Sequence, residues 1–427
     1  MGQHQPERNR RAGQTQELTQ KVCHSATNAE NPGVSELSHI IQAEIARNGP
    51  ISFARFMELA LYHPGLGYYE TGRNQVGFLG DFYTSVSAGE LFGQLLAFRF
   101  ASWLEAFAEG GKDLWLIEAG AHDGQLANDI LGWLREQRPE LYTRLQYGIV
   151  DPSRQRQEWQ REKLAEFGGR VRWFDSLASI ASLRGDSPLP SPPFHAGEAV
   201  RLDADPLATM EPANSGISGV VFSNELRDAM PVQRLGWDAS SRAWFEWGVD
   251  WDGVAFVWSK LGGGNTGAIS QSNLTGELLA VLPEGYTIEV SPAAEAWWRE
   301  AAGILKHGKL LAIDYGFTQE EMISPARTNG TLRAYRRHQY CNDLLANPGA
   351  QDLTAHVNFS AIQAVGEKAG LKTDGYLTQP QFLTGILGEA IKDASLGAWT
   401  EKRTRQFQTL THPQHLGRAF KVLVQTR

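Results

Sequence analysis

The alternation of apolar runs with amphipathic segments predicts an α/β fold for most of the chain. Short apolar runs, each typical of a strand buried on both faces, alternate with segments whose apolar residues recur every three or four positions. The runs lie at 114–118, 147–150, 171–174, 219–223 and 309–314, and two more, at 371–377 and 419–425, predict a final pair of strands. Because crossovers between parallel strands are right-handed, we expect a doubly wound, Rossmann-like sheet of seven strands with an antiparallel terminal hairpin.

The segments that precede the sheet have a different pattern. Residues 1–34 are polar and lack periodicity, which predicts a disordered tail. Residues 35–105 predict an N-terminal helical cap, in which Ser35 and Ser52 can cap helices and 90–104 forms an apolar helix. The main domain is then expected over 106–427.

Three insertions are predicted within this main domain. Residues 184–216 are rich in Pro and Ala and read as an irregular loop. Three aromatic-rich runs within 232–261 predict an antiparallel meander, which continues as a loop to residue 290. Residues 380–410 predict a helical excursion before the last strand. The meander carries tryptophans that either form a partner surface or fill the underside of a small sheet: Trp244, Trp247, Trp251 and Trp258.

Composition excludes several classes of protein. The 427 residues carry a formal net charge of −8, which argues against general nucleic-acid binding. No apolar stretch approaches the roughly 18 residues of a membrane span. Two cysteines are too few for a disulfide framework, and neither His338 nor His356 belongs to a metal-binding pattern, so no metal is expected. With no convincing targeting signal, a cytoplasmic location is expected.

The loop after the first predicted strand indicates the cofactor. It reads Glu118-Ala-Gly-Ala-His-Asp-Gly124, and ligands of doubly wound sheets bind at such carboxyl ends where strand order reverses. Gly120 and Gly124 permit a tight turn and close approach to a ligand. A dinucleotide needs G-x-G-x-x-G, but His122 occupies the second glycine position, and Asp123 would oppose phosphates. S-adenosyl-L-methionine has no phosphate, and its sulfonium cation suits a loop that has Glu118 at its root.

Asp151 ends the second predicted strand. Its carboxylate can accept hydrogen bonds from both ribose hydroxyls, in an adenosyl cofactor and in NAD alike. The alternative is a turn residue before Pro152 that caps the following helix.

The segment 223–231 follows the fourth predicted strand, beside the first. If it turns helically, Glu225 and Asp228 lie at i and i+3 on one face, where two carboxylates can hold a guanidinium and accept its proton. The alternative is that both acids cap a helix and pair with Arg227 or another cation. Tyr315, after the fifth strand, either lines the cleft or is a core aromatic.

Several separated segments resemble one known family. They are 51–70 (ISFARFMELALYHPGLGYYE), 80–84 (GDFYT), the Glu118 loop, 223–232 (SNELRDAMPV), 285–297 (GYTIEVSPAAEAW), 313–316 (IDYG) and 330–359. The chain resembles the MidA-like class I methyltransferases, which include a mitochondrial complex I assembly factor. The resemblance implies S-adenosyl-L-methionine as cofactor and a set of cleft residues: Gly80, Asp81, Glu118, Gly120, Gly124, Asp151, Asn224 and Glu225. The chain departs from the family at His122, a usual Gly, and at Asn358, a usual Asp.

The resemblance also implies a reaction. The mitochondrial relative is linked to arginine methylation of a complex I subunit, so we expect a protein arginine methyltransferase, located in the mitochondrial matrix if the source is eukaryotic. The chain can instead be a non-enzymatic assembly or chaperone protein, for which His122 and the aromatic meander are the motivation. The sequence also allows a small-molecule methyltransferase and, more remotely, an NAD-dependent enzyme.

Overall fold

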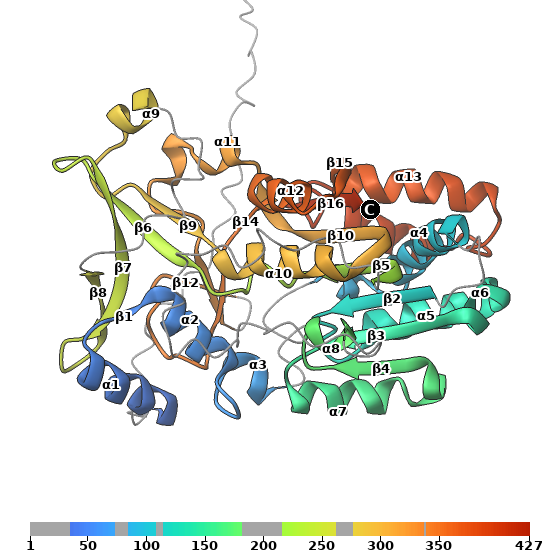
Figure 1. Ribbon diagram of the computed structural model, residues 1–427, viewed down its shortest axis with the longest axis horizontal. Coiled ribbons are helices and arrows are strands. Elements are labelled where there is room, and N and C mark those ends of the chain that lie inside the picture. Colours follow the sequence, from blue (N-terminus) through green and yellow to red (C-terminus); the bar gives the residue numbers. More distant parts are fainter. Residues whose placement is uncertain (1–34, 73–83, 108–113, 182–215, 262–275, 337–338) are drawn as a thin grey trace, which may run out of the picture.

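The computed structural model describes residues 35–72, 84–107, 114–181, 216–261, 276–336 and 339–427 (Figure 1). The expected tail, nearly all of the 184–216 loop and three singled-out residues lie outside these ranges. The three residues are Gly80, Asp81 and His338.

The central sheet has seven strands along one path, and an eighth strand that was not expected. The path runs β15 (Lys372–Thr378), β16 (Phe420–Thr426), β10 (Leu305–Phe317), β5 (Ile217–Asn224), β2 (Leu114–Ala119), β3 (Leu145–Val150) and β4 (Val171–Phe174). Only β16 runs against its neighbours. The extra strand, β14 (Val357–Asn358), pairs in parallel with the end of β10. Strand order reverses between β2 and β5, so their carboxyl ends flank the switch point where ligands bind.

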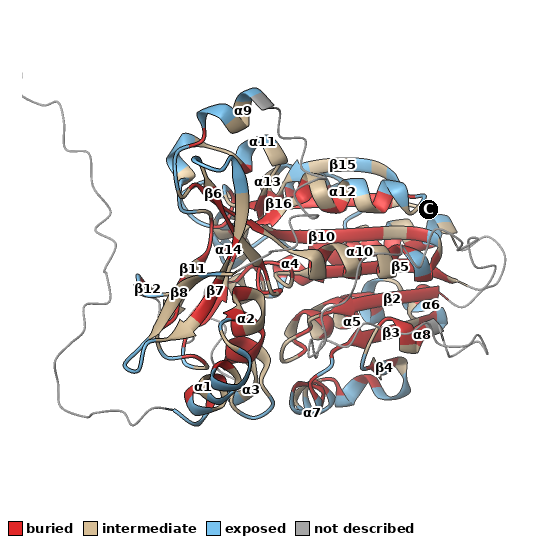
Figure 2. Ribbon diagram, turned by 60° about the vertical axis from the view of Figure 1, so that its left-hand side comes forward, coloured by how far each residue is buried: buried red, intermediate tan, exposed pale blue. Residues whose placement is uncertain are grey.

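Helices cover both faces of this sheet (Figures 1 and 2). One face packs against α4 (Leu91–Phe107), α5 (Gln125–Gln137), α13 (Gln379–Lys392) and α14 (Glu401–Thr411). The other packs against α8 (Ala178–Ala181), α10 (Pro292–Ile304) and α12 (Phe359–Lys368). Helix α4, which falls within the segment expected as a cap, packs in the core layer: ten of its 17 residues are buried, mainly against α5 and the sheet.

The three runs expected as a meander belong to a larger second sheet. The runs form β6 (Gln233–Asp238), β7 (Ala243–Trp251) and β8 (Phe256–Leu261), but β1 (Ile51–Ser52) and β9 (Thr287–Val290) join them, giving five strands. The expected meander is too small because β1 comes from the N-terminal segment, about 200 residues away. Helices α1 (Glu36–Asn48) and α2 (Phe53–Tyr62) share an apolar cluster with this sheet.

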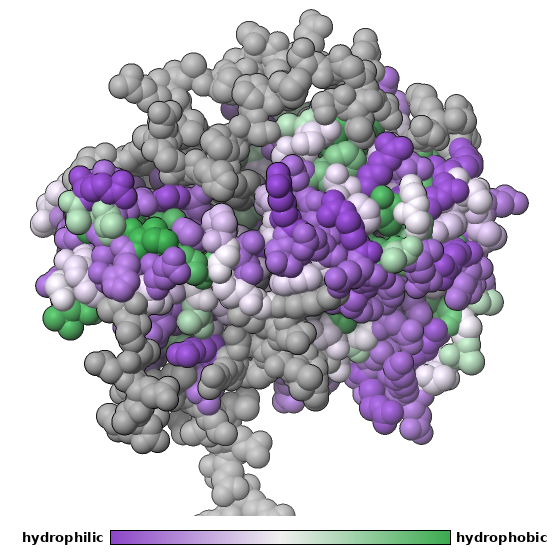
Figure 3. All heavy atoms as spheres, turned by 90° about the horizontal axis from the view of Figure 1, so that it is seen from below, coloured by the Kyte–Doolittle hydropathy of each residue, from purple (hydrophilic) through white to green (hydrophobic). Residues whose placement is uncertain are grey.

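The tryptophans of the second sheet pack against aromatic residues of the sheet itself and of α2. Trp258 lies 5.1 Å from Phe53 of α2, and Trp251 lies 5.0 Å from Phe256. Trp244 and Trp247 are also half-buried, against other aromatic rings. The face of the molecule in Figure 3 carries mostly hydrophilic side chains, with hydrophobic ones in small separate patches.

A third, smaller sheet and several short helices complete the fold. A three-stranded sheet of β11 (Arg333–Arg336), β12 (Gln339–Cys341) and β13 (Asp352–Thr354) was not expected. The shorter elements are α3 (Tyr68–Thr71), α6 (Pro139–Arg144), α7 (Arg154–Lys163), α9 (Gly276–Val281) and α11 (Gln319–Met322). Among the described residues, no helix combines the length and the apolar character needed to cross a bilayer.

Candidate functional site

Glu118, at the end of β2, is buried and hydrogen-bonded. Only 2% of it is exposed, and the hydroxyl of Tyr147 donates to it at 2.5 Å. Burial raises its pKa to about 8, although the Tyr147 hydrogen bond opposes the rise. The carboxyl is therefore mainly protonated at neutral pH, and it does not supply the negative charge that the loop sequence suggested.

The following loop owes its shape to three left-handed residues. Gly120, His122 and Gly124 have φ of 74°, 46° and 85°. A Cβ on Gly120 would lie 2.8 Å from Cδ1 of Leu226, so a side chain there would collide with the loop after β5. His122 adopts this backbone despite its side chain, a conformation in which His is several-fold enriched among non-glycine residues.

The ionised carboxylate of this loop is Asp123. Burial opposes its ionisation, but the neighbouring His122 and Lys163 outweigh burial and hold its pKa below the usual range. Nζ of Lys163 lies 2.7 Å from Oδ2 of Asp123. The loop's negative charge thus lies at Asp123, partly neutralised by Lys163.

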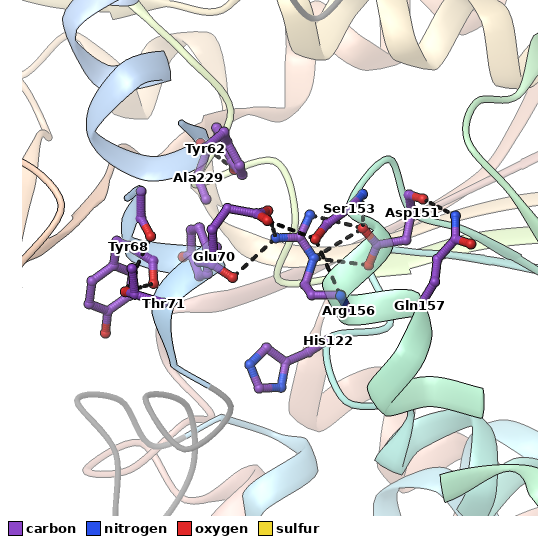
Figure 4. Close-up of polar contacts among 12 residues, drawn as sticks. Tyr62, Tyr68, Glu70, Thr71, His122, Asp151, Ser153, Arg156, Gln157 and Ala229 are labelled. Carbon is purple, nitrogen blue, oxygen red and sulfur yellow. Dashed lines mark hydrogen bonds and ion pairs between the residues drawn. The ribbon is translucent and has the colours of Figure 1, made fainter. Parts of the chain in front are cut away.

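Asp151 is almost fully buried, with its oxygens already engaged (Figure 4). Oδ1 accepts from the amide of Ser153 at 3.0 Å and from Nη2 of Arg156 at 2.9 Å. Oδ2 accepts from Nε of Arg156 at 3.0 Å and from Nε2 of Gln160 at 2.9 Å. A carboxylate offers about four lone-pair positions, so in this arrangement it cannot also accept two ribose hydroxyls. Ser153, not Asp151, caps α7.

Arg156 links the end of β3 to the N-terminal segment. Its Nη1 donates to Oε1 of Glu70 in α3 at 3.0 Å, and Figure 4 shows it lying between Glu70 and Asp151. The hydroxyl of Ser153 donates to Oε2 of Glu70 at 3.0 Å. Glu70 and Arg156 are not predictable from the sequence, because no local pattern links two residues that are 86 positions apart.

The segment after β5 does not form a helix, so Glu225 and Asp228 do not share a helix face as expected. Asp314 of β10 instead holds this segment, because its Oδ2 accepts from the amides of Leu226 at 3.2 Å and Arg227 at 2.8 Å. Glu225 takes a left-handed backbone, with φ of 49°. The alternative pairing of these acids with Arg227 is also wrong, because the Arg227 side chain lies against Trp297 and Trp298.

The two acids nevertheless belong to one carboxyl cluster. Burial and the neighbouring charges of Asp314, Asp352 and Glu225 raise the pKa of Asp228 well above its ordinary value. Burial raises the pKa of Glu225 to about 8, against hydrogen bonds from the Ser85 amide and Asn224. Burial likewise raises the pKa of Asp314 to about 6. The ionised form of these carboxyls is therefore disfavoured unless a cation binds beside them.

Two tyrosines of the N-terminal segment border this cluster. The hydroxyl of Tyr69 donates to Oδ1 of Asp352 in β13 at 2.9 Å, and that of Tyr62 donates to the carbonyl of Ala229 at 2.9 Å. Their rings stack 5.6 Å apart. Sequence analysis did not assign these tyrosines or Asp352 to the site, although the segments 51–70 and 330–359 contain them.

The remaining singled-out residues have structural contacts. The Tyr315 ring lies 3.9 Å from that of Phe420, and His356 stacks on Phe317 at 4.7 Å. Asn358 caps α12 by accepting from the amide of Ala361 at 3.2 Å. Asn and Asp cap helices equally well, so this departure from the family pattern preserves the cap.

The chemistry at the switch point fits an adenosyl sulfonium cofactor. Gly120 provides backbone that a Cβ would block, and Asp123 provides negative charge without a phosphate-binding glycine pattern. Oδ1 of Asn224 is buried and has no hydrogen-bond partner within the described ranges, so it can accept from an ammonium. Within those ranges, no group of three or more His, Cys, Asp or Glu is placed to hold a metal ion.

Known proteins are similar to this chain in sequence and fold. A family model described as "Putative S-adenosyl-L-methionine-dependent methyltransferase" matches residues 95–377. The mitochondrial protein arginine methyltransferase NDUFAF7 of Homo sapiens is 27% identical over 409 residues, covering 92% of this chain and 83% of the relative. The Drosophila melanogaster homolog is 27% identical over 413 residues, covering 93% and 86%. A Burkholderia thailandensis "likely methyl transferase", solved with S-adenosyl-homocysteine, is 32% identical, with a TM-score of 0.72 and 92% of each chain covered.

The family match spans well over half of the chain. The chain therefore belongs to this family, and it is an S-adenosylmethionine-dependent methyltransferase with a class I α/β fold.

Proposed function

We propose that this chain methylates arginine side chains of a protein. The observation that carries the proposal is the buried carboxyl cluster at the ends of β5, β10 and β13, in which burial and then the neighbouring charge of Asp314 raise the pKa of both Asp228 and Glu225. Such a cluster favours a cationic acceptor, since a guanidinium would compensate the charges that burial disfavours. The curated relatives are named as protein arginine methyltransferases.

Glu225 and Asp228 are the proposed catalytic residues. Both lie beside the loop after β2, because Leu226 between them packs against Gly120. A guanidinium held by these carboxylates would lower their pKa, and either carboxylate could then take the proton that the methylated nitrogen loses. Tyr62 and Tyr69 would form an aromatic wall of the acceptor site.

The proposed cofactor-binding residues are Gly80, Asp81, Glu118, Gly120, Gly124, Asp151 and Asn224. When bound, S-adenosyl-L-methionine supplies a methyl group on a sulfonium for in-line displacement, a reaction that depends largely on positioning. Asn224 would accept from the cofactor's ammonium, and Gly120 would allow close approach. For Asp151 to bind ribose, Arg156 or Gln160 would have to release one of its oxygens.

The test is transfer of radiolabelled methyl groups into cell lysate, followed by mass spectrometry of labelled bands for methylarginine. We expect E225Q and D228N each to lower the rate about a hundredfold, in line with other groups that act at the transition state. The matched control is E320Q, since Glu320 is an exposed carboxylate on α11. Absence of methylarginine, or full activity in both variants, would refute the proposal.

The same experiment separates protein methylation from the competing functions. Label in small molecules alone would indicate a small-molecule methyltransferase. Saturable binding of S-adenosyl-homocysteine without any transfer would favour a non-enzymatic assembly protein. The curated relatives are named as mitochondrial, and a mitochondrial location and a substrate in respiratory complex I belong to the same proposal for this chain.

A further inference from the structure

The backbone amide of Ser85 contacts Glu225, one of the two proposed catalytic residues. It donates to Oε1 of Glu225 at 3.0 Å, across 140 positions of the sequence. The side-chain amide of Asn224 donates to the same oxygen at 3.1 Å. Within the described ranges, Oε2 of Glu225 accepts no hydrogen bond. Oε1 therefore anchors the carboxyl, and Oε2 is left for an acceptor.

Ser85 is itself held from the other side. It is fully buried, and its hydroxyl donates to Oε1 of Gln379 at 3.2 Å. Gln379 is the first residue of α13 and is also fully buried. Its Nε2 donates to the carbonyl of Leu410, near the end of α14, at 2.9 Å. One side-chain amide thus connects Ser85 to both helices of the C-terminal excursion.

The turn that contains Ser85 is fixed at further points. The hydroxyls of Thr84 and Ser87 are hydrogen-bonded to each other at 2.7 Å, within the turn. At its far end, a Cβ on Gly89 would overlap the side-chain amide of Gln406 in α14. The turn is therefore held by its own hydrogen bonds and by helices that lie about 300 positions further along the chain.

We propose that Ser85 and Gln379 are positioning residues for methyl transfer, which hold the Ser85 amide against Oε1 of Glu225 and so fix the orientation of that carboxyl. The inference rests on the proposed function of Glu225. Methyl transfer depends largely on positioning, and a displacement of about 1 Å can cost a hundredfold in rate. Helices α13 and α14 carry none of the proposed catalytic or cofactor-binding residues, and this contact gives them a part in the reaction.

Loss of the contact has a consequence that a purely structural role would not have. The Ser85 hydrogen bond favours the ionised form of Glu225, against the burial that raises its pKa to about 8. Weakening this bond should raise that pKa further. The other titratable groups near Glu225 are Asp228 in the same loop and Asp314 and Tyr315 of β10. They stay in place when Ser85 or its partner is substituted.

The experiment titrates Glu225 in the full chain by ¹³C NMR, with glutamate labelled at Cδ and with E225Q to identify the signal. S85A removes the anchoring hydroxyl, and Q379M keeps the side-chain length but loses both hydrogen bonds. In each, the ionisation of Glu225 should weaken about threefold or more, as expected when a hydrogen bond is lost. The control is Q381M on the same helix. It removes hydrogen bonds between Gln381 and Thr378 and should leave the pKa of Glu225 unchanged.

The second measurement is the rate of radiolabelled methyl transfer into lysate protein. S85A and Q379M should each lower this rate about tenfold or more, with little change in the Kd of S-adenosyl-homocysteine. The double variant S85A/Q379M should lose no more than Q379M alone, because both side chains act through one contact. Circular dichroism and urea denaturation establish folding, and S85A, which removes a single oxygen, keeps the test decisive if Q379M does not fold.

The inference and the proposed function can fail separately. The titration needs no acceptor, so a wild-type pKa of Glu225 in folded S85A and Q379M overturns the inference alone. Wild-type transfer rates in both variants also overturn it while E225Q remains impaired. Full activity in E225Q would refute the catalytic role of Glu225, and the inference with it.

Discussion

Arg156 donates hydrogen bonds from Nε and Nη2 to the carboxylate of Asp151, and the pair is buried at the end of β3. The same guanidinium reaches Glu70 of α3, so one side chain joins the switch-point region to the N-terminal segment. Tyr69, next to Glu70, in turn binds Asp352 on the acceptor side. The pair therefore belongs to a polar path between the two halves of the proposed active site.

Loss of Arg156 should destabilise the protein strongly. R156M leaves Asp151 as a buried carboxylate without its cation, and breaking a buried pair in this way costs about 3–5 kcal/mol of unfolding free energy. Urea denaturation measures the loss. R154M is the matched control on the same helix, where Arg154 is exposed and its replacement should change stability by less than about 0.5 kcal/mol. Equal losses in the two variants would show that the buried pair contributes little.

Adding a methyl group at Gly120 should weaken cofactor binding. G120A forces a side chain into left-handed backbone and places its Cβ against Leu226, which displaces the loop. Calorimetry with S-adenosyl-homocysteine should show affinity reduced about tenfold or more. In the control G132A, a Cβ in α5 meets nothing within 4 Å, and affinity should not change.

A second substitution tests the cause. L226A removes the side chain that the new Cβ would meet, so the double variant G120A/L226A should recover part of the affinity lost in G120A. If the double variant binds no better than G120A, the defect comes from backbone strain and not from the collision.

Periodicity was enough to predict seven of the central strands. Apolar runs such as Leu114–Glu118 are buried on both faces, and this burial imposes a pattern that can be read locally. The second sheet is larger than periodicity predicts because β1 is only two residues long, and its pairing with β7 is a long-range contact. Short strands such as β14 have no readable period.

The candidate site was predicted in outline only. Local motifs located the loops at Gly120 and Asn224 because glycine and acid patterns at strand ends are local. The contacts that define the site join distant segments. Asp314 accepts hydrogen bonds from the amides of Leu226 and Arg227, and the hydroxyl of Tyr69 donates one to Asp352.

Glu118 should make stability depend on pH. Its pKa is about 8 when folded and near the ordinary 4.5 when unfolded, so between these values the folded state holds a proton that the unfolded state releases. Stability from this group is present below pH 4.5 and falls as pH rises to about 8, by on the order of a few kcal/mol. E118Q cannot titrate, so its unfolding free energy relative to wild type should increase from pH 5 to pH 8. A difference that stays constant with pH would contradict this, and E320Q serves as the exposed control.

Asp314 should matter for the acceptor more than for the cofactor. Its two oxygens accept from three backbone amides, and D314N replaces one oxygen by a donor that cannot accept, leaving at least one buried amide unpaired. The unfolding free energy should fall by about 1–3 kcal/mol.

The freed loop would misplace Glu225 and Asp228. Misplacement by about 1 Å can cost a hundredfold in rate, so we expect kcat/KM of the D314N variant for the acceptor to fall by about that factor. Calorimetry should show little change in the Kd of S-adenosyl-homocysteine. The control D393N removes an exposed carboxylate paired with Arg138, and it should leave kcat/KM for the acceptor and the Kd of S-adenosyl-homocysteine unchanged. If D314N weakens cofactor binding as much as it lowers kcat/KM, Asp314 organises the whole switch point and not the acceptor loop alone.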